Sequence, residues 1–245
     1  MRRPTPVVGA TIVVLVAVFA LTALAVRFVP GGERLYEELE LVPSLTLHGA
    51  RLWTLLTAAL LHSLDDPTHI LFNGLVFYFF GPDLEELYGR RRFLLFMALC
   101  ALVGNLFVVG AVGLGLSHTS SVVGFSGVTM GVTAAWGLTF PDREMFFFFF
   151  PMRGLTLVWV TLAMQIIVAL SFSNTSAAAH FGGMAAGAAF TLTQGGPVRR
   201  WWLQRKLRRL QTQRDGLRGA RRASGPDLRV IRGGGDTPKD KRYLN

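Results

Sequence analysis

The chain alternates between long apolar stretches and shorter polar connections. Apolar residues dominate six stretches, which run over 7–28, 68–88, 93–116, 126–140, 155–173 and 178–195. A helix needs about 20 residues to cross the hydrocarbon core of a bilayer, and the first three stretches and the fifth reach that length alone. The pattern therefore predicts an all-α membrane protein built as a bundle of six transmembrane helices.

The fourth stretch, 126–140, is too short to reach both membrane surfaces. At 1.5 Å per residue it forms a helix of about 22 Å. Phe140-Pro141-Asp142 ends it on one side, and Ser126 begins it on the other. A helix that begins below the membrane surface must open onto protein or a water-filled cavity, because lipid cannot satisfy its free N–H groups. We therefore expect Ser126 to lie at a polar site inside the membrane region.

Composition also indicates a lipid environment. Hydrophobic residues make up 51% of the chain and charged residues 16%, with a mean hydropathy of +0.42, whereas a soluble domain has about 25% charged residues. Such a chain cannot hide its apolar residues in one water-soluble core. The single cysteine, Cys100, allows no internal disulfide and is predicted to be a small buried hydrophobe.

The net charge of +10 is concentrated at the C-terminal end. Residues 199–245 hold 15 Lys+Arg and 4 Asp+Glu, a net of +11, so residues 1–198 carry a net of −1. We therefore predict a membrane domain over 1–198 and a basic cytoplasmic tail over 199–245. The tail is expected to face anionic lipid, and nucleic acid, the alternative for a polybasic segment, is not expected as a partner. Its first part, 199–211, is predicted to be an amphipathic helix, and the residues beyond Gly216 are predicted to be disordered.

Basic residues in the connections indicate the orientation. One side holds Arg2, Arg3, Arg90, Arg91, Arg92, Arg143, Arg153 and the basic tail. The connections 117–125 and 174–177, on the other side, contain no Lys or Arg. By the positive-inside rule both termini are cytoplasmic, which agrees with six spans and places Ser126 and His180 at the outer ends of their helices.

Two further segments bear on localisation. The first apolar stretch is longer than the hydrophobic part of a signal peptide and is expected to stay as a span. The phenylalanine run 146–150 is expected to be an aromatic segment at the cytoplasmic membrane interface. We therefore expect a multi-pass protein of a bacterial inner (plasma) membrane.

Polar residues at the heads of two Gly- and Ala-rich stretches supply the parts of an acyl-transfer site. Ser126 lies in Gly-Phe-Ser-Gly and His180 in Ala-His-Phe-Gly-Gly. Gly127 in the fourth stretch, and Gly183 and Gly187 in the sixth, would let the two helices approach closely. Ser126 Oγ would then lie within hydrogen-bond reach of His180, the one plausible base at the same depth.

A second polar pair lies at the start of the second stretch. Asp66 and Pro67 are typical of a helix start, so His69 and Asn73 fall four residues apart on one helix face. The Asn73 amide, the His69 imidazole and the backbone N–H of Ser126 can stabilise an oxyanion. Because the last three stretches contain no Asp or Glu, the site would be a Ser-His dyad without a buried carboxylate.

Each of these residues also has a simpler explanation. Serine at a helix start is often only a cap, and small residues spaced like Gly183 and Gly187 are a common packing motif. Histidine within a span is harder to explain in this way, because intramembrane ionisable groups are costly and usually functional. Taken alone, the residues leave open a hydrolase and a transporter or channel with a polar site.

Three separated motifs in order resemble the rhomboid family of intramembrane serine proteases, and the resemblance covers about residues 48–195. The matching segments are His69-Ile70-Leu71-Phe72-Asn73 for the second span, Gly124-Phe125-Ser126-Gly127 for the nucleophile, and Ala179-His180-Phe181-Gly182-Gly183 with Gly187 for the base. The family's six-helix core equals the number of apolar stretches.

The resemblance implies a role for each motif residue. It implies Ser126 as nucleophile, His180 as general base, His69 and Asn73 as oxyanion stabilisers, and Gly124 as the residue that shapes the turn. The activity implied is hydrolysis of a peptide bond in transmembrane protein substrates through an acyl-enzyme. Neither a metal nor an organic cofactor is implied.

The sequence departs from the family pattern at three places. Met130 occupies a position that is often tyrosine, Trp53 is followed by Thr54 instead of arginine, and His62 lies seven residues before His69, wider than the common spacing. The dyad itself is intact. The first alternative is an inactive rhomboid-like protein that binds membrane helices, and the second is a small transporter.

Overall fold

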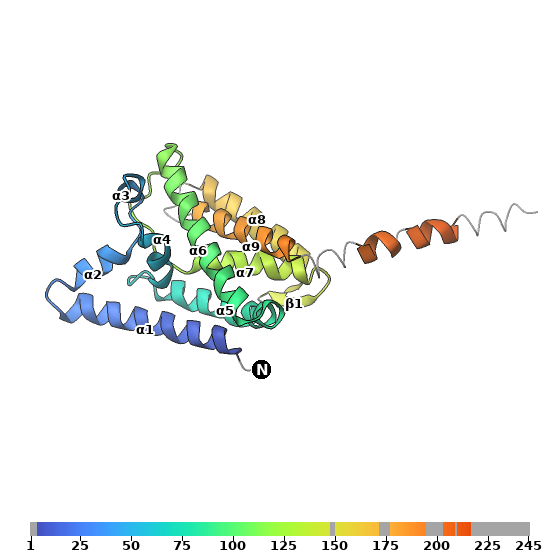
Figure 1. Cartoon of the computed structure of the whole chain (residues 1–245), viewed down its shortest axis with the longest axis horizontal. Helices are drawn as coiled ribbons and strands as arrows, with labels where there is room; N and C mark the ends of the chain where they lie inside the picture. Colours follow the sequence, from blue (N-terminus) through green and yellow to red (C-terminus); the bar gives the residue numbers. More distant parts are fainter. Residues whose placement is uncertain (1–3, 148–149, 172–176, 195–202, 209, 217–245) are drawn as a thin grey trace, which may run out of the picture. The chain divides into compact units, whose positions relative to one another are not determined.

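A computed structural model describes residues 4–147, 150–171, 177–194, 203–208 and 210–216, which are mostly helical (Figure 1). The chain divides into two units, Met1–Arg199 and Arg200–Asn245. All six apolar stretches contain a helix, and these are α1 (Pro6–Phe28), α5 (Pro67–Tyr88), α6 (Arg90–Gly113), α7 (Ser126–Thr139), α8 (Gly154–Leu170) and α9 (Ala177–Thr193). The sequence therefore located the main helices correctly, and their assignment as spans stays a prediction.

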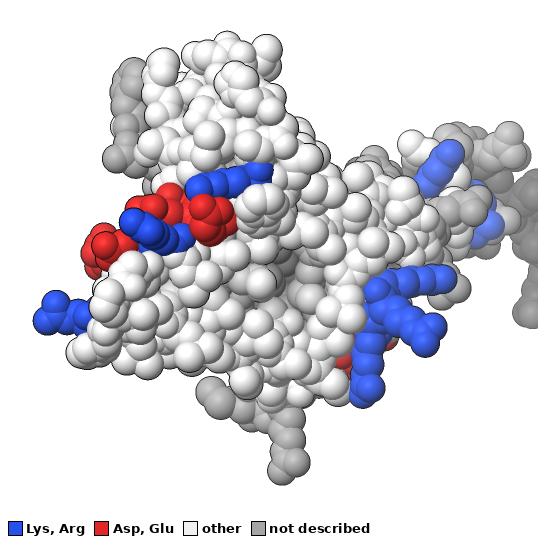
Figure 2. All heavy atoms as spheres, turned by 60° about the vertical axis from the view of Figure 1, so that its left-hand side comes forward, with Lys and Arg blue, Asp and Glu red and all other residues white. Residues whose placement is uncertain are grey.

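Helix lengths and surfaces fit a membrane environment. Among the described residues, α1 and α6 are long and apolar enough to cross a membrane, and α8 is a shorter apolar helix. Large apolar side chains lie on the outside of the bundle, among them Leu21, Leu71, Trp159 and Leu170, each more than 60% exposed. Figure 2 shows the charged side chains of one face in separate groups, with a broad uncharged surface between them.

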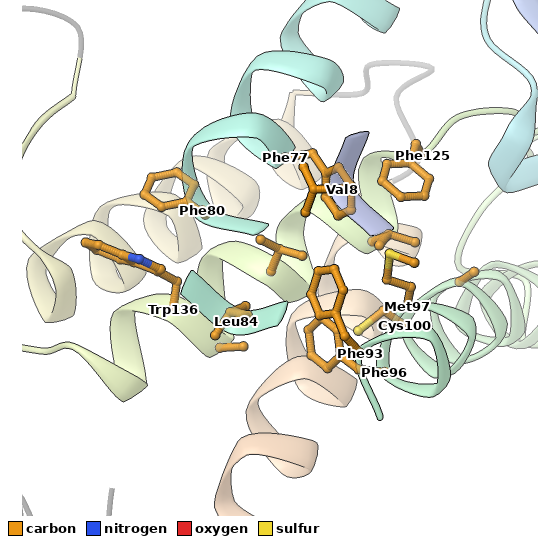
Figure 3. Close-up of a cluster of buried hydrophobic side chains, with 14 of the residues drawn as sticks. Val8, Phe77, Phe80, Leu84, Phe93, Phe96, Met97, Cys100, Phe125 and Trp136 are labelled. Carbon is orange, nitrogen blue, oxygen red and sulfur yellow. The ribbon is translucent and has the colours of Figure 1, made fainter. Parts of the chain in front are cut away.

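The short helix α7 forms the centre of the first unit. It has 14 residues, about 21 Å, and most of them are buried. α7 packs most extensively against α9 and also contacts α5, α6 and α8, while α1 packs against α5 (Figure 1). Buried apolar side chains from α1, α5, α6 and α7 fill one cluster, which includes Val8, Phe77, Phe93, Phe96, Cys100 and Trp136 (Figure 3). Cys100 is fully buried, as predicted.

Glycines set the distance between α7 and α9. A Cβ atom added to Gly183 would lie 1.9 Å from the carbonyl oxygen of Gly127, and one added to Gly187 would lie 2.3 Å from that of Gly131. Real side chains never approach so closely, so the two helices pack backbone against backbone.

The connection between α1 and α5 contains four short helices that the apolar pattern did not predict. These are α2 (Gly32–Leu39), α3 (Pro43–Leu47), α4 (Thr54–Thr57) and the 3₁₀ turn η1 (Ala58–Leu60). Arg51 and Trp53 donate side-chain hydrogen bonds of 2.9 Å to the Glu37 and Glu38 carbonyl oxygens at the end of α2. Arg51, two residues before Trp53, therefore contacts the same helix end as Trp53.

A short β-hairpin lies between α7 and α8. Its antiparallel strands are β1 (Glu144–Phe147) and β2 (Phe150–Arg153), with Glu144 opposite Arg153 and Met145 opposite Met152. Sequence analysis expected only an aromatic segment here, because an unbroken run of phenylalanines shows no alternation of polar and apolar residues. Residues 148–149 and the side chains of the run lie outside the described part, so the interfacial position of the run stays a prediction.

The second unit contains a helical segment over 203–208 and 210–216. Leu203, Leu207 and Leu210 are exposed at helical spacing among basic residues. The start of the predicted amphipathic helix, 199–202, and the predicted disordered segment, 217–245, lie outside the described residues.

Candidate active site

Ser126 and His180 meet at the ends of α7 and α9. Ser126 is the first residue of α7, and His180 lies in the first turn of α9. The His180 Nε2 atom lies 2.8 Å from Ser126 Oγ, a hydrogen-bond distance between residues 54 positions apart. His180 is buried, whereas Ser126 is partly exposed. Part of Ser126 is therefore accessible at the surface, while most of the His180 side chain is enclosed by protein.

Ser126 does not cap its helix. The N-cap position of α7 is Phe125, and no side chain caps this end. The simpler explanation of Ser126 as a helix cap is therefore wrong. The first N–H groups of α7 have no intrahelical partner and lie at the positive end of the helix dipole, so they can stabilise negative charge beside Ser126.

Gly124 shapes the turn that leads into α7. Its φ angle is +130°, and a Cβ atom at this position would lie 2.5 Å from Cε1 of His69. Its backbone N–H donates a 2.9 Å hydrogen bond to the carbonyl oxygen of Ala58 in η1. Both the backbone angle and the nearby imidazole require glycine here. The same contact places His69 beside the turn that carries Ser126.

Asn73 is connected to the first turn of α7 through Thr129. The Thr129 hydroxyl lies 3.0 Å from Asn73 Oδ1 and 3.0 Å from the carbonyl oxygen of Ser126. The start of α5 is as the sequence predicted: Asp66 is the N-cap and accepts a 3.0 Å hydrogen bond from Thr68 N–H, and Pro67 follows it. His69 and Asn73 thus both approach the first turn of α7 from α5.

His62 joins this group, although its sequence spacing gave no basis for a role. Its side chain is fully buried, its Nε2 lies 3.2 Å from Asn73 Nδ2, and its ring packs edge-on against that of His69 at 5.2 Å. Residues 63–66, with a bend at 64–65, connect His62 to α5. Burial lowers the pKa of His62 to about 4. The ring is therefore neutral near pH 7 and can accept a hydrogen bond from the Asn73 amide.

Gln165 is a site residue that sequence analysis missed. It lies on α8, is buried, and places Oε1 2.6 Å from Nδ1 of His180. Its Nε2 lies 4.0 Å from the sulfur of Met130. Sequence analysis expected only Asp or Glu as a partner of the histidine, and the available signal was the one amide side chain in the apolar helix α8.

Metal-binding residues do not gather at this site or elsewhere in the described part of the chain. No three His, Cys, Asp or Glu side chains lie close enough there to hold a metal ion.

Comparison with known proteins agrees with the resemblance to the rhomboid family. The family model for the rhomboid domain matches residues 49–196, so the chain belongs to the rhomboid family. It is also similar to a Bacillus subtilis (strain 168) protein named Putative rhomboid protease YdcA, with 29% identity over 135 residues. That match covers 55% of this chain and 63% of the relative. An all-α membrane protein fits both the family and the helical structure.

Proposed function

We propose that this rhomboid-family protein is an intramembrane serine endopeptidase. The observation that carries the proposal is the 2.8 Å contact between Ser126 Oγ and His180 Nε2 at the start of a buried helix. Serine is a weak nucleophile until an adjacent base takes its proton, and this geometry supplies the base. Ser126 is partly exposed, as a nucleophile that meets a substrate must be.

The proposed reaction has two halves. Ser126 Oγ attacks the carbonyl carbon while His180 Nε2 takes the hydroxyl proton, and His180 then donates that proton to the leaving amine. Water next attacks the ester carbon with the same base, releases the acyl group and restores Ser126. The N–H groups at the start of α7, the Asn73 amide and the His69 imidazole stabilise the oxyanion in both halves.

The proposed substrate is a transmembrane helix of another protein. The broad uncharged surface on one face of the bundle supports a position in the bilayer (Figure 2). The proposed topology has six spans and both termini in the cytoplasm, as the apolar stretches and the basic connections predict. A spanning helix keeps its amides in its own hydrogen bonds, so the substrate must unwind locally before cleavage. Helix-breaking Gly or Pro near the cleaved bond would favour that step.

The tail has a separate proposed partner, anionic lipid at the cytoplasmic surface. Its described helix presents Leu203, Leu207 and Leu210 together with Arg205, Lys206, Arg208 and Arg214. Exposed leucines at helical spacing among cations are typical of helices that lie on anionic membranes.

Labelling with a fluorophosphonate tests the enzyme directly. We expect covalent modification at Ser126, abolished in Ser126→Ala and His180→Ala and unchanged in the control Ser171→Ala, whose hydroxyl follows α8 and donates to the carbonyl oxygen of Ile167 in its last turn. A folded wild-type protein that takes no label would indicate a membrane-helix binder without catalysis. Charge movement across liposomes that persists in Ser126→Ala would indicate a transporter.

A further inference from the structure

The Nδ1 atom of His180 has a defined partner. General-base catalysis by Nε2 requires that Nε2 carry a lone pair, so the single proton of the neutral ring must lie on Nδ1. Which nitrogen carries that proton is set by the hydrogen bond that the other nitrogen makes. In Ser-His-Asp sites a carboxylate accepts from Nδ1–H. Here the contacting atom is Oε1 of Gln165, 2.6 Å away.

Met130 favours one orientation of the Gln165 amide. A thioether sulfur can accept a weak hydrogen bond and can donate none. The NH₂ group of Gln165 therefore belongs on the side of Met130 Sδ, 4.0 Å away, and the amide oxygen belongs on the side of His180. Since an amide oxygen only accepts, Nδ1 must donate, and the lone pair of Nε2 then points at Ser126.

We propose that Gln165 is a positioning residue that holds His180 in the Nδ1–H tautomer, so that a neutral amide does the work a carboxylate does in a Ser-His-Asp site. This role rests on the proposed function and adds a third member to its dyad. It also explains how the site can operate with methionine at position 130: the sulfur orients the amide, and the amide orients the ring.

Among the described residues, Gln165 is the one that contacts His180 Nδ1. Ser126 faces it from α7, and His69 on α5 is close enough to influence it electrostatically. No acidic residue occurs in α7, α8 or α9. Gln165 is itself buried, at 8% exposure, so water competes little for its amide oxygen.

Three variants separate positioning from a structural role. Gln165→Leu should slow fluorophosphonate labelling about 10- to 100-fold, because a misplaced base costs that much. Gln165→Glu keeps an acceptor oxygen and should restore the labelling rate. A carboxylate also favours the protonated imidazole, so the fall in labelling rate on the acid side should begin at a higher pH than in the wild-type protein. The control Gln194→Leu makes the same change near the other end of α9, where Gln194 contacts Arg92, and should label at the wild-type rate. A wild-type labelling rate in Gln165→Leu would overturn the positioning role. So would a Gln165→Glu protein that labels as slowly as Gln165→Leu and has the pH dependence of the wild-type protein.

Tautomer measurement keeps the test independent of proteolysis. Long-range ¹H–¹⁵N NMR of ¹⁵N-histidine-labelled protein in detergent should show His180 as the Nδ1–H tautomer, with that state lost in Gln165→Leu and kept in Gln194→Leu. The signal is assigned by its disappearance in His180→Ala. An Nε2–H tautomer in the wild-type protein would overturn the positioning role. An inactive wild-type protein with the Nδ1–H tautomer would contradict only the proposed protease function.

Discussion

The carbonyl oxygen of Gly127 lies where a side chain at position 183 would have to be, 1.9 Å from the Cβ atom that any other residue would add. α7 and α9 carry Ser126 and His180 one turn or less from this contact. The distance between the Ser126 and His180 side chains is therefore coupled to a glycine contact that involves neither of them.

Gly183→Ala should push α9 away from α7. We expect a loss of about 1–3 kcal/mol in the free energy of unfolding, as for overpacked cores, and a fall in labelling at Ser126 of about 10²-fold, because the base is displaced. The control Gly110→Ala adds a methyl group where nothing lies within 4 Å. Wild-type labelling and stability in Gly183→Ala would show that the contact does not set the distance.

Gly124→Ala should disable the turn before the nucleophile. The added methyl group meets the His69 imidazole at 2.5 Å and strains a backbone at φ +130°, at a cost of about 1–3 kcal/mol for the backbone alone. We expect labelling to fall at least about 10²-fold. Gly115→Ala is the matched control, since Gly115 has φ +69° but no atom within 4 Å. Equal effects of both changes on labelling would attribute the loss to backbone strain and contradict a role for the His69 contact.

Glu85→Ala should destabilise the protein without altering the site. Glu85 on α5 is buried and accepts 3.0 Å hydrogen bonds from the Val7 and Val8 N–H groups, and Thr5 donates to it as well. It thus acts as the cap that α1 lacks in its own sequence. We expect a loss of about 2–3 kcal/mol, measured by thermal unfolding in detergent, with labelling per folded molecule unchanged. The exposed Glu33→Ala serves as control, and equal stability of the two variants would contradict the capping role.

His62 should make stability depend on pH in the acidic range. Its pKa is about 4 in the folded protein and 6.5 when unperturbed, so the unfolded chain binds a proton first as the pH falls. The contribution of neutral His62 to the free energy of unfolding is fully present above pH 6.5. It is lost as the pH falls towards 4, by about 3 kcal/mol at most. His62→Gln, which keeps an acceptor for Asn73, should flatten this dependence in thermal unfolding, whereas the exposed His118→Gln should not. A His62→Gln protein as acid-sensitive as the wild type would contradict this assignment.

Local sequence patterns predicted the six long helices, whereas the short helices between α1 and α5 depend on long-range contacts. The apolar stretches located α1 and α5 to α9, and Asp66-Pro67 predicted the start of α5, because length and capping are local properties. The short helices α2 to α4 have no such pattern; α2, for example, is anchored by Arg51 and Trp53 from beyond its own end.

In the candidate site, too, some residues could be predicted from the sequence and others only from the fold. Ser126 and His180 could be paired from their motifs and their matching depth. Gln165 could not, because its contact with His180 forms only when α8 is placed beside α9. The spacing of His62 from His69 predicted no role for His62, although its ring contacts Asn73 in the fold.

Cleavage of a transmembrane substrate tests the proposed peptidase most directly. Purified wild-type protein and Ser126→Ala, reconstituted in liposomes with a single-span substrate containing helix-breaking residues, are compared for production of the two fragments. We predict that the wild-type protein cuts the substrate at a peptide bond within or beside its span and that Ser126→Ala, equally folded, does not. Equal cleavage by both proteins would contradict the assignment of Ser126 as the nucleophile.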